Sequence, residues 1–153
     1  RSTPSNSSAA SDVYKRQELK YKDIEIVYKF EEKPVHVTTD PKMLEQVLVN
    51  LVTNAIHAIG EKPNGRGRID LRTEAKPNYA EVAISDNGPG IKEKNREKIF
   101  NLFFTTKPPG TGTGLGLPIC QNIMRKLGGK ISFQTELGAG TTFVISIPSA
   151  HNQ

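Results

Sequence analysis

The chain has 153 residues, of which 35% are hydrophobic and 24% charged, the balance expected of a single globular domain. Its formal net charge is +5, but the basic residues are scattered and not interleaved with aromatic ones, which argues against a nucleic-acid-binding surface. One cysteine cannot form an internal disulfide and no apolar run is long enough to span a bilayer, so we expect a cytoplasmic domain without membrane contact of its own, whether or not the intact protein is anchored to a membrane.

The N-terminal 17 residues are rich in Ser, Ala and Asn and show no apolar period. We expect residues 1–17 to be a disordered leader outside the fold, either native or added to the protein. The ordered domain should run over residues 18–148, with 149–153 as a frayed tail. Apolar residues that alternate from Ile24 to Phe30 predict a first short strand, and residues 35–37 predict a second.

A long amphipathic helix is predicted from residue 41 to about residue 59. Asp40 supplies an N-cap acceptor, Pro41 suits the first helical position, and Gly60 would end the helix. The apolar residues cover one broad arc of the helix: Leu44, Val47, Leu48, Leu51, Val52, Ala55, Ile56, Ala58 and Ile59. This arc should pack on a sheet.

Three polar residues of the same helix fall together outside the apolar arc. Asn50, Asn54 and His57 lie within about 60° of one another at 100° per residue. Taken singly, each is expected to be a solvated surface residue. Their shared side of the helix makes them candidates for a binding site.

The middle of the chain predicts a hairpin, a tight turn and a second helix. Residues 69–75 and 81–85 alternate and flank a Lys-Pro-Asn turn, and the run DNGPGI follows at 86–91. Residues 92–103 predict a helix with a Phe-rich end. The segment 105–113 must be a loop because Pro108 and Pro109 cannot continue a helix.

A glycine-rich loop, GTGTGLGLP at 110–118, leads into the last predicted helix, about 115–127. Glycines permit close backbone approach and a helix N-terminus attracts anions, so we expect a phosphate there. The spacing matches neither the dinucleotide fingerprint nor the P-loop. Gly128-Gly129 would cap the helix, and Cys120 lies on its apolar stripe, which predicts packing and not chemistry.

Two strands, 131–135 and 142–147, are predicted to close the chain around a glycine-containing turn, 138–140. Each motif has an ordinary explanation when taken by itself. The run at 86–90 could be only a turn, and 138–140 could be a plain hairpin loop. The order and spacing of all five motifs together argue for a common site.

This set of motifs resembles the catalytic, ATP-binding domain of sensor histidine kinases, within the wider superfamily of gyrase, heat-shock chaperone and mismatch-repair ATPases. Residues 50–58 look like the N box, 86–91 the G1 box, 99–107 the F box, 112–117 the G2 box, and 138–143 the final glycine motif. The resemblance implies an α/β two-layer sandwich, in which a mixed sheet of about five strands packs on three helices.

The resemblance implies ATP as ligand, and the residue types at its G1 box suit adenine. Asp86 can accept a hydrogen bond from the exocyclic amine of adenine, which guanine cannot supply at that position. Gly88 and Gly90 allow a tight turn beside the base, and Ile91 can pack on its face. We therefore expect selectivity for adenine over guanine.

The helix amides suit Mg²⁺, the second implied cofactor. Asn54 offers a neutral oxygen to a metal that keeps several waters and shares the phosphates. Asn50, one turn earlier, can bind a metal-bound water or a phosphate. Lys107, at the start of a mobile lid, could approach the γ-phosphate, although a solvated loop lysine is an equally good prediction.

The remaining predicted nucleotide contacts come from the glycine loop and the last strand. The expected phosphate-binding residues are Thr111, Gly112, Thr113, Gly114, Leu115, Gly116 and Leu117. Thr141 and Thr142 resemble the closing threonines of the family, and Thr142 is the predicted contact. A purely structural role in the sheet would also explain both.

Two positions discriminate within the superfamily. ATP-hydrolysing relatives carry a glutamate as general base where this chain has Asn50, which cannot take up a proton, so phosphoryl transfer is favoured over hydrolysis. His57 stands where many histidine kinases have a phosphate-contacting lysine, and the alternative is that His57 is only a neutral hydrogen-bonding or packing residue. Together with the short Thr-Thr-Lys lid, it resembles the nitrogen-regulation-type branch.

The phosphoacceptor histidine of the family is not expected in this chain. None of His36, His57 and His151 is followed by the acidic residue and helical context of the acceptor motif. We expect a monomeric domain that serves a histidine on a separate dimerisation domain, and through it a response regulator. The alternative is a nucleotide-dependent regulatory binding module, similar to the anti-sigma kinases, without efficient phosphotransfer.

Overall fold

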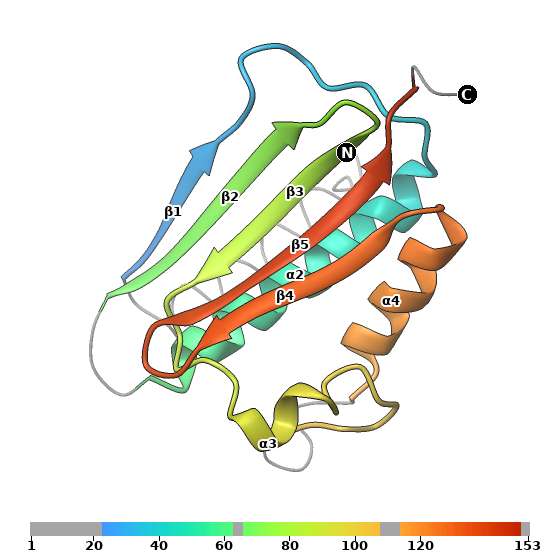
Figure 1. Ribbon diagram of the computed structural model, residues 1–153. Coiled ribbons are helices and arrows are strands. Elements are labelled where there is room, and N and C mark those ends of the chain that lie inside the picture. Colours follow the sequence, from blue (N-terminus) through green and yellow to red (C-terminus); the bar gives the residue numbers. More distant parts are fainter. Residues whose placement is uncertain (1–22, 63–65, 108–113, 151–153) are drawn as a thin grey trace, which may run out of the picture.

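The computed structural model describes residues 23–62, 66–107 and 114–150. The described elements, in chain order, are β1 (Ile24–Lys29), α2 (Pro41–Gly60), β2 (Gly67–Ala75), β3 (Tyr79–Asp86), α3 (Glu93–Arg96), α4 (Gly116–Lys126), β4 (Lys130–Glu136) and β5 (Gly140–Pro148). The strands form one five-stranded sheet in the order β1-β2-β3-β5-β4. Figure 1 shows α2 and α4 behind this sheet, on one face, and α3 near the end of α4.

The sheet is mixed because one of its strand pairs is parallel. β1 pairs in parallel with β2, while the β2–β3, β3–β5 and β5–β4 pairs are antiparallel. A parallel pair needs a long crossover connection, and α2 lies in the segment that joins β1 to β2. The predicted two-layer α/β sandwich with about five strands is confirmed.

The long helix begins and ends where the sequence predicts. The Asp40 carboxylate accepts hydrogen bonds from the backbone N–H groups of Lys42 (3.0 Å) and Met43 (3.2 Å), which satisfies two unpaired donors of the first turn. The residues of α2 that are fully buried belong to the predicted apolar arc: Val47, Leu51, Ala55, Ile56 and Ile59.

The core lies between α2, α4 and the covered face of the sheet. The sheet supplies Ile69, Ile84, Phe143, Ile145 and Ile147, and α4 supplies Cys120, Ile123 and Met124. Cys120 is completely buried, so its predicted packing role is confirmed. Of the helices in the described ranges, none combines the length and apolar character that a membrane crossing requires.

The second predicted helix, residues 92–103, is wrong in length, since α3 covers only Glu93–Arg96. The chain then turns with hydrogen bonds that span three residues, from Lys98 N–H to Asn95 and from Asn101 N–H to Lys98. Phe103 has φ +65°, which no helix accommodates. Burial of Ile99 and partial burial of Phe104 against the core take precedence over helical continuity.

The predicted strand at 35–37 is reduced to a single bridge between Val37 and Ser149. The same contact orders the start of the predicted tail. Ser149 N–H donates to Asn78 and Ala150 N–H donates to His36, so the hydrogen-bonded structure extends two residues past Pro148. Residues 1–17 and 151–153 lie outside the described residues.

Candidate functional site

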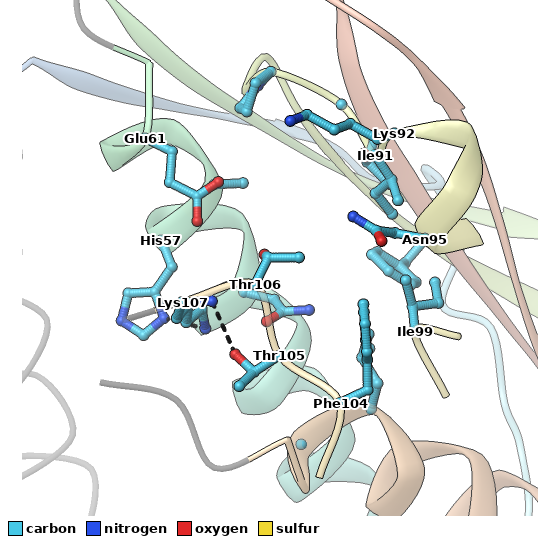
Figure 2. Close-up of a pocket in the computed structure, with 18 of the residues that line it drawn as sticks. His57, Glu61, Ile91, Lys92, Asn95, Ile99, Phe104, Thr105, Thr106 and Lys107 are labelled. Atoms are coloured by element: carbon cyan, nitrogen blue, oxygen red, sulfur yellow. Dashed lines mark hydrogen bonds between the residues drawn. The ribbon is translucent and has the colours of Figure 1, made fainter. Parts of the chain in front are cut away.

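A cavity of about 1010 Å³ opens between α2, the turn after β3, α3, the start of α4 and residues 104–107, which we call the lid root. Figure 2 shows His57 and Glu61 projecting from α2 toward Lys107, with Ile91, Ile99 and Phe104 forming another wall. The cavity is also lined by Asn50, Asn54, Asp86, Leu117 and Thr141. Segments from α2 to β5 therefore border one cavity.

The polar stripe of α2 forms one wall of this cavity. Asn50, Asn54 and His57 all line it, as the helix geometry predicts, because the opposite side of α2 is buried on the sheet. Glu61 continues the stripe one turn beyond His57. Sequence reasoning missed Glu61, although its spacing of four residues from His57 is the signal that could have found it.

Asn50 also contacts the neighbouring helix. Its side chain hydrogen-bonds the Cys120 thiol, which lowers the pKa of that thiol, but burial is the larger effect and raises the pKa to about 11. The thiol therefore stays protonated at neutral pH and is a poor nucleophile. The contact ties the amide of Asn50 to α4.

Asp86 ends β3 inside the cavity, where its carboxylate has lost most of its water. This burial raises its pKa from 3.8 to about 6. Backbone hydrogen bonds from Gly88 and Thr141 oppose the rise, while the charge of Glu61 adds to it. One carboxylate oxygen accepts from Gly88 N–H at 2.8 Å. A ligand that donates a hydrogen bond to this carboxylate would compensate its lost hydration.

The turn after β3 is tightly packed from two sides. A Cβ at Gly88 would lie 2.9 Å from the Asp86 carboxylate and 3.0 Å from Ala58 of α2. Gly90 has φ +79° and leaves room for the carbonyl of Glu136, the last residue of β4. Ile91 lines the cavity, and its N–H donates to Thr135 Oγ1 at 2.9 Å. The predicted glycines are thus required by close approach.

The β4–β5 hairpin packs against the turn after β3 and holds it in place. The sequence did not predict this contact. Gly138 N–H donates to the Pro89 carbonyl at 2.8 Å. Gly140 has φ +129°, and a Cβ there would collide with the carbonyl of Asp86. The predicted hairpin loop is therefore part of the structure that places Asp86.

The structure places the two neighbouring threonines differently. Asp86 pairs with Thr141 and Ser85 with Thr142 in the β3–β5 register. Thr141 is buried and lines the cavity, and its backbone N–H donates a hydrogen bond to the Asp86 carboxylate. Thr142, the predicted contact, does not line the cavity, and its hydroxyl lies 2.6 Å from the Ser85 hydroxyl. Successive residues of a strand face opposite sides of a sheet.

Lys107 reaches the α2 stripe from the lid root. Its Nζ lies 2.8 Å from Nδ1 of His57, and its backbone N–H donates to Thr105 Oγ1 at 3.1 Å, the dashed line in Figure 2. Burial lowers the pKa of Lys107, while the charge of Glu61 acts to raise it. Lys107 is therefore half-buried within the cavity and not a solvated loop residue.

The glycine loop is described only in part. Thr111, Gly112 and Thr113 lie outside the described residues. Gly114 and Gly116 line the cavity, as does Leu117 in the first turn of α4, whereas Leu115 is the residue before that helix and is not in the lining. Gly114 has φ +69° and lies against the backbone of Phe103, whose N–H donates to its carbonyl at 2.9 Å.

Comparisons of the sequence identify related proteins. The family described as histidine kinase-, DNA gyrase B-, and HSP90-like ATPase matches residues 39–151. The sensor histidine kinase ZraS of Salmonella typhimurium is 37% identical over 133 residues, 86% of this chain and 27% of ZraS. The sensor kinase CckA of Brucella abortus is 41% identical over 127 residues, 73% of this chain and 13% of CckA. The chain thus spans about a quarter or less of these relatives.

Solved structures with the same fold agree with this result. The catalytic domain of histidine kinase ThkA, in a nucleotide-free form, is 34% identical with a TM-score of 0.75, covering 92% of this chain and 90% of that one. Full-length ShkA in complex with AMPPNP is 26% identical with a TM-score of 0.76, covering 93% of this chain and 29% of ShkA.

Proposed function

The chain belongs to the family of histidine kinase-, DNA gyrase B- and HSP90-like ATPases, and on that premise we propose that it is the catalytic ATP-binding domain of a sensor histidine kinase. The named relatives are sensor kinases, and their greater length supports further domains in the intact protein. The observation that carries the proposal is the cavity that unites Asp86, the α2 amides and Lys107.

Adenine binds at Asp86 in this proposal. The desolvated carboxylate accepts a hydrogen bond from the exocyclic amine, and Thr141 beside it adds a hydroxyl. Ile91 packs against the base from the lid side of the turn. The AMPPNP bound to ShkA supports an adenine nucleotide as the ligand of this fold.

The residues present fit Mg²⁺ because a neutral amide oxygen is a ligand that this metal accepts. Asn54 lines the cavity on the same stripe as Asn50 and would hold the ion, while the amide atom of Asn50 that does not bond the Cys120 thiol would serve a water or phosphate. When bound, Mg²⁺ neutralises charge on the phosphates. The glycine loop and the first turn of α4 contribute N–H groups for phosphate oxygens.

Phosphoryl transfer is favoured over hydrolysis because Asn50 cannot act as a general base for water. The chain then contributes positioning and charge. Lys107 supplies an ammonium for the γ-phosphoryl group, and the cavity walls hold the nucleotide for in-line attack. The acceptor is a histidine on a separate dimerisation domain, which passes the group to an aspartate of a response regulator.

The finer assignments follow from the same residues. His57 and the Thr-Thr-Lys lid root support the nitrogen-regulation-type branch. We place the catalytic domain at residues 18–148, with 1–17 as a leader and 149–153 as a tail whose first two residues are hydrogen-bonded to the domain, in the cytoplasm and as a monomer in isolation. Whether the intact kinase is anchored in a membrane depends on its other domains.

Calorimetric titration tests the ligand. ATP and a non-hydrolysable analogue should bind, GTP should not, and Mg²⁺ should strengthen binding of both adenine nucleotides. Equal affinity for ATP and GTP would exclude Asp86 as the base-selecting group. The exposed variant Glu97→Gln, outside the cavity, serves as a control that should bind as the unaltered chain does.

Phosphotransfer tests the reaction. The domain is mixed with separately prepared histidine acceptor domains of sensor kinases and radiolabelled Mg·ATP, and acid-labile label on the acceptor is followed. Label on the acceptor supports the kinase. Tight ATP binding without any label would favour the regulatory module. Steady phosphate release by the domain without an acceptor would favour an ATPase and would contradict the role given to Asn50.

A further inference from the structure

Two basic side chains from different segments meet inside the cavity. Lys107 of the lid root places Nζ 2.8 Å from Nδ1 of His57 on α2. Figure 2 shows the lid root passing the α2 stripe at this point. Two cations would repel at this distance, so the two side chains are not both protonated.

If Lys107 is charged, only one arrangement of protons makes its contact with His57 a hydrogen bond. An ammonium group has three donors and no acceptor. Nδ1 of His57 must therefore accept, which leaves the imidazole neutral with its proton on Nε2. A lysine at position 57 could not accept in this way.

Burial lowers the pKa of Lys107, and the nearby charge of Glu61 opposes this shift and favours the protonated form. Glu61 lies one turn after His57 on the same side of α2. On the other side, the Lys107 backbone is fixed by its hydrogen bond to Thr105 Oγ1. Backbone and ammonium are thus both held, although a lysine side chain has four rotatable bonds.

We propose that His57 is a positioning residue, which fixes the Lys107 ammonium beside the α2 amides and does not itself act on the phosphates. The inference rests on the proposed kinase function. A lysine that is already ordered loses less conformational entropy when it engages the transferring group. His57 then contributes to transfer only through Lys107.

The first test measures the pair without any reaction. Nitrogen-15 NMR of the imidazole in the nucleotide-free chain should show a neutral ring with an accepting Nδ1. Lys107→Ala should shift the Nδ1 resonance, whereas Lys98→Ala, at an exposed position outside the cavity, should not. An Nδ1 signal that is unchanged by Lys107→Ala would exclude the pairing, whatever the chain does with ATP.

The second test is a double-mutant cycle on transfer to an acceptor domain at saturating Mg·ATP. His57→Leu should slow transfer roughly 10-fold with little change in nucleotide affinity, since a hydrogen bond to a charged group is lost. His57→Gln should restore much of the rate because its amide oxygen can accept. In a Lys107→Ala background, His57→Leu should have little further effect.

The outcomes separate the inference from the proposed function. An equal effect of His57→Leu with and without Lys107 would mean that His57 acts directly, which overturns the inference. Unchanged or faster transfer in His57→Leu would do the same. If the unaltered chain binds ATP but labels no acceptor, the kinase function fails, and the NMR result decides whether the His57–Lys107 pair exists. His36→Leu, at an exposed histidine, controls for loss of an imidazole.

Discussion

At the scale of single residues, Asp86 has opposite effects on the stability of the nucleotide-free domain and on nucleotide binding. Its pKa in the folded state is about 6, above its ordinary 3.8, so the folded protein binds this proton more tightly than the unfolded chain does. The stabilising contribution of the protonated form is fully present below about pH 4. It is lost as the pH rises through 6, so the ionised carboxylate weakens the nucleotide-free domain at neutral pH.

Asp86→Asn should therefore stabilise the nucleotide-free domain by about 1–3 kcal/mol at pH 7, with a gain that shrinks toward pH 4. The same change should weaken ATP binding by about 1–3 kcal/mol, the usual effect of losing a hydrogen bond to a charged group. Urea denaturation at several pH values and calorimetry measure the two effects. A destabilised variant at pH 7 would contradict the raised pKa.

Asn54 should differ from its neighbours because its contribution to ATP affinity depends on Mg²⁺. Asn54→Ala should reduce ATP affinity about 10- to 100-fold in the presence of Mg²⁺ and much less in EDTA. Calorimetry under both conditions measures the difference. Asn101→Ala, at an exposed position outside the cavity, should affect neither titration. Equal losses with and without metal would give Asn54 a structural role only.

Helix geometry explains which site residues could be predicted at this scale. The positions of Asn50, Asn54 and His57 follow from a rotation of 100° per residue once the apolar arc is known. Thr141 and Thr142 could not be separated, because a shift of one residue in strand register exchanges the face of every side chain. The contact of Lys107 with His57 depends on the path of the lid root, which no local pattern encodes.

At the scale of elements, the β4–β5 turn offers a matched pair of glycines. Gly138 and Gly140 both have positive φ, but a Cβ at Gly138 would meet open space, whereas one at Gly140 would meet the Asp86 carbonyl. Gly138→Ala should cost about 1–2 kcal/mol of stability through backbone strain. Gly140→Ala adds a steric clash and should cost about 3 kcal/mol or more.

Urea denaturation measures this pair of variants, and ATP titration shows whether Asp86 has moved. We expect Gly140→Ala to lose nucleotide affinity and Gly138→Ala to retain most of it. Similar stability and affinity in both variants would mean that the hairpin does not hold the Asp86 turn.

The elements differ in how well their sequence specifies them. α2 carries a cap, a periodic apolar arc and a terminating glycine, and its bounds agree with the prediction to within one residue. The region after α3 has no cap or regular apolar period that agrees with its burial. Ile99 and Phe104 pack inward, while Phe103 remains exposed. Tertiary burial decides its path, so the predicted helix was too long.

At the scale of the whole molecule, ligand binding should stabilise the domain as a unit, because the cavity is bounded by segments from α2 to β5. Mg·ATP at 100 times its dissociation constant should add about 2.7 kcal/mol, which raises the melting temperature by about 5–11 °C for a domain of this size. Differential scanning calorimetry tests this, with GTP as control. An equal shift with GTP would contradict adenine recognition.

The position of β5 has a consequence for how the protein is made. β5 is the last described strand in chain order, yet it lies between β3 and β4. During synthesis on the ribosome, the inner edges of β3 and β4 stay unpaired until β5 has emerged, and such edges invite association with other chains. Gly140 and Thr141 belong to β5, so a nascent chain that lacks β5 also lacks the residues that place Asp86. The domain should therefore complete its fold only after β5 has emerged from the ribosome.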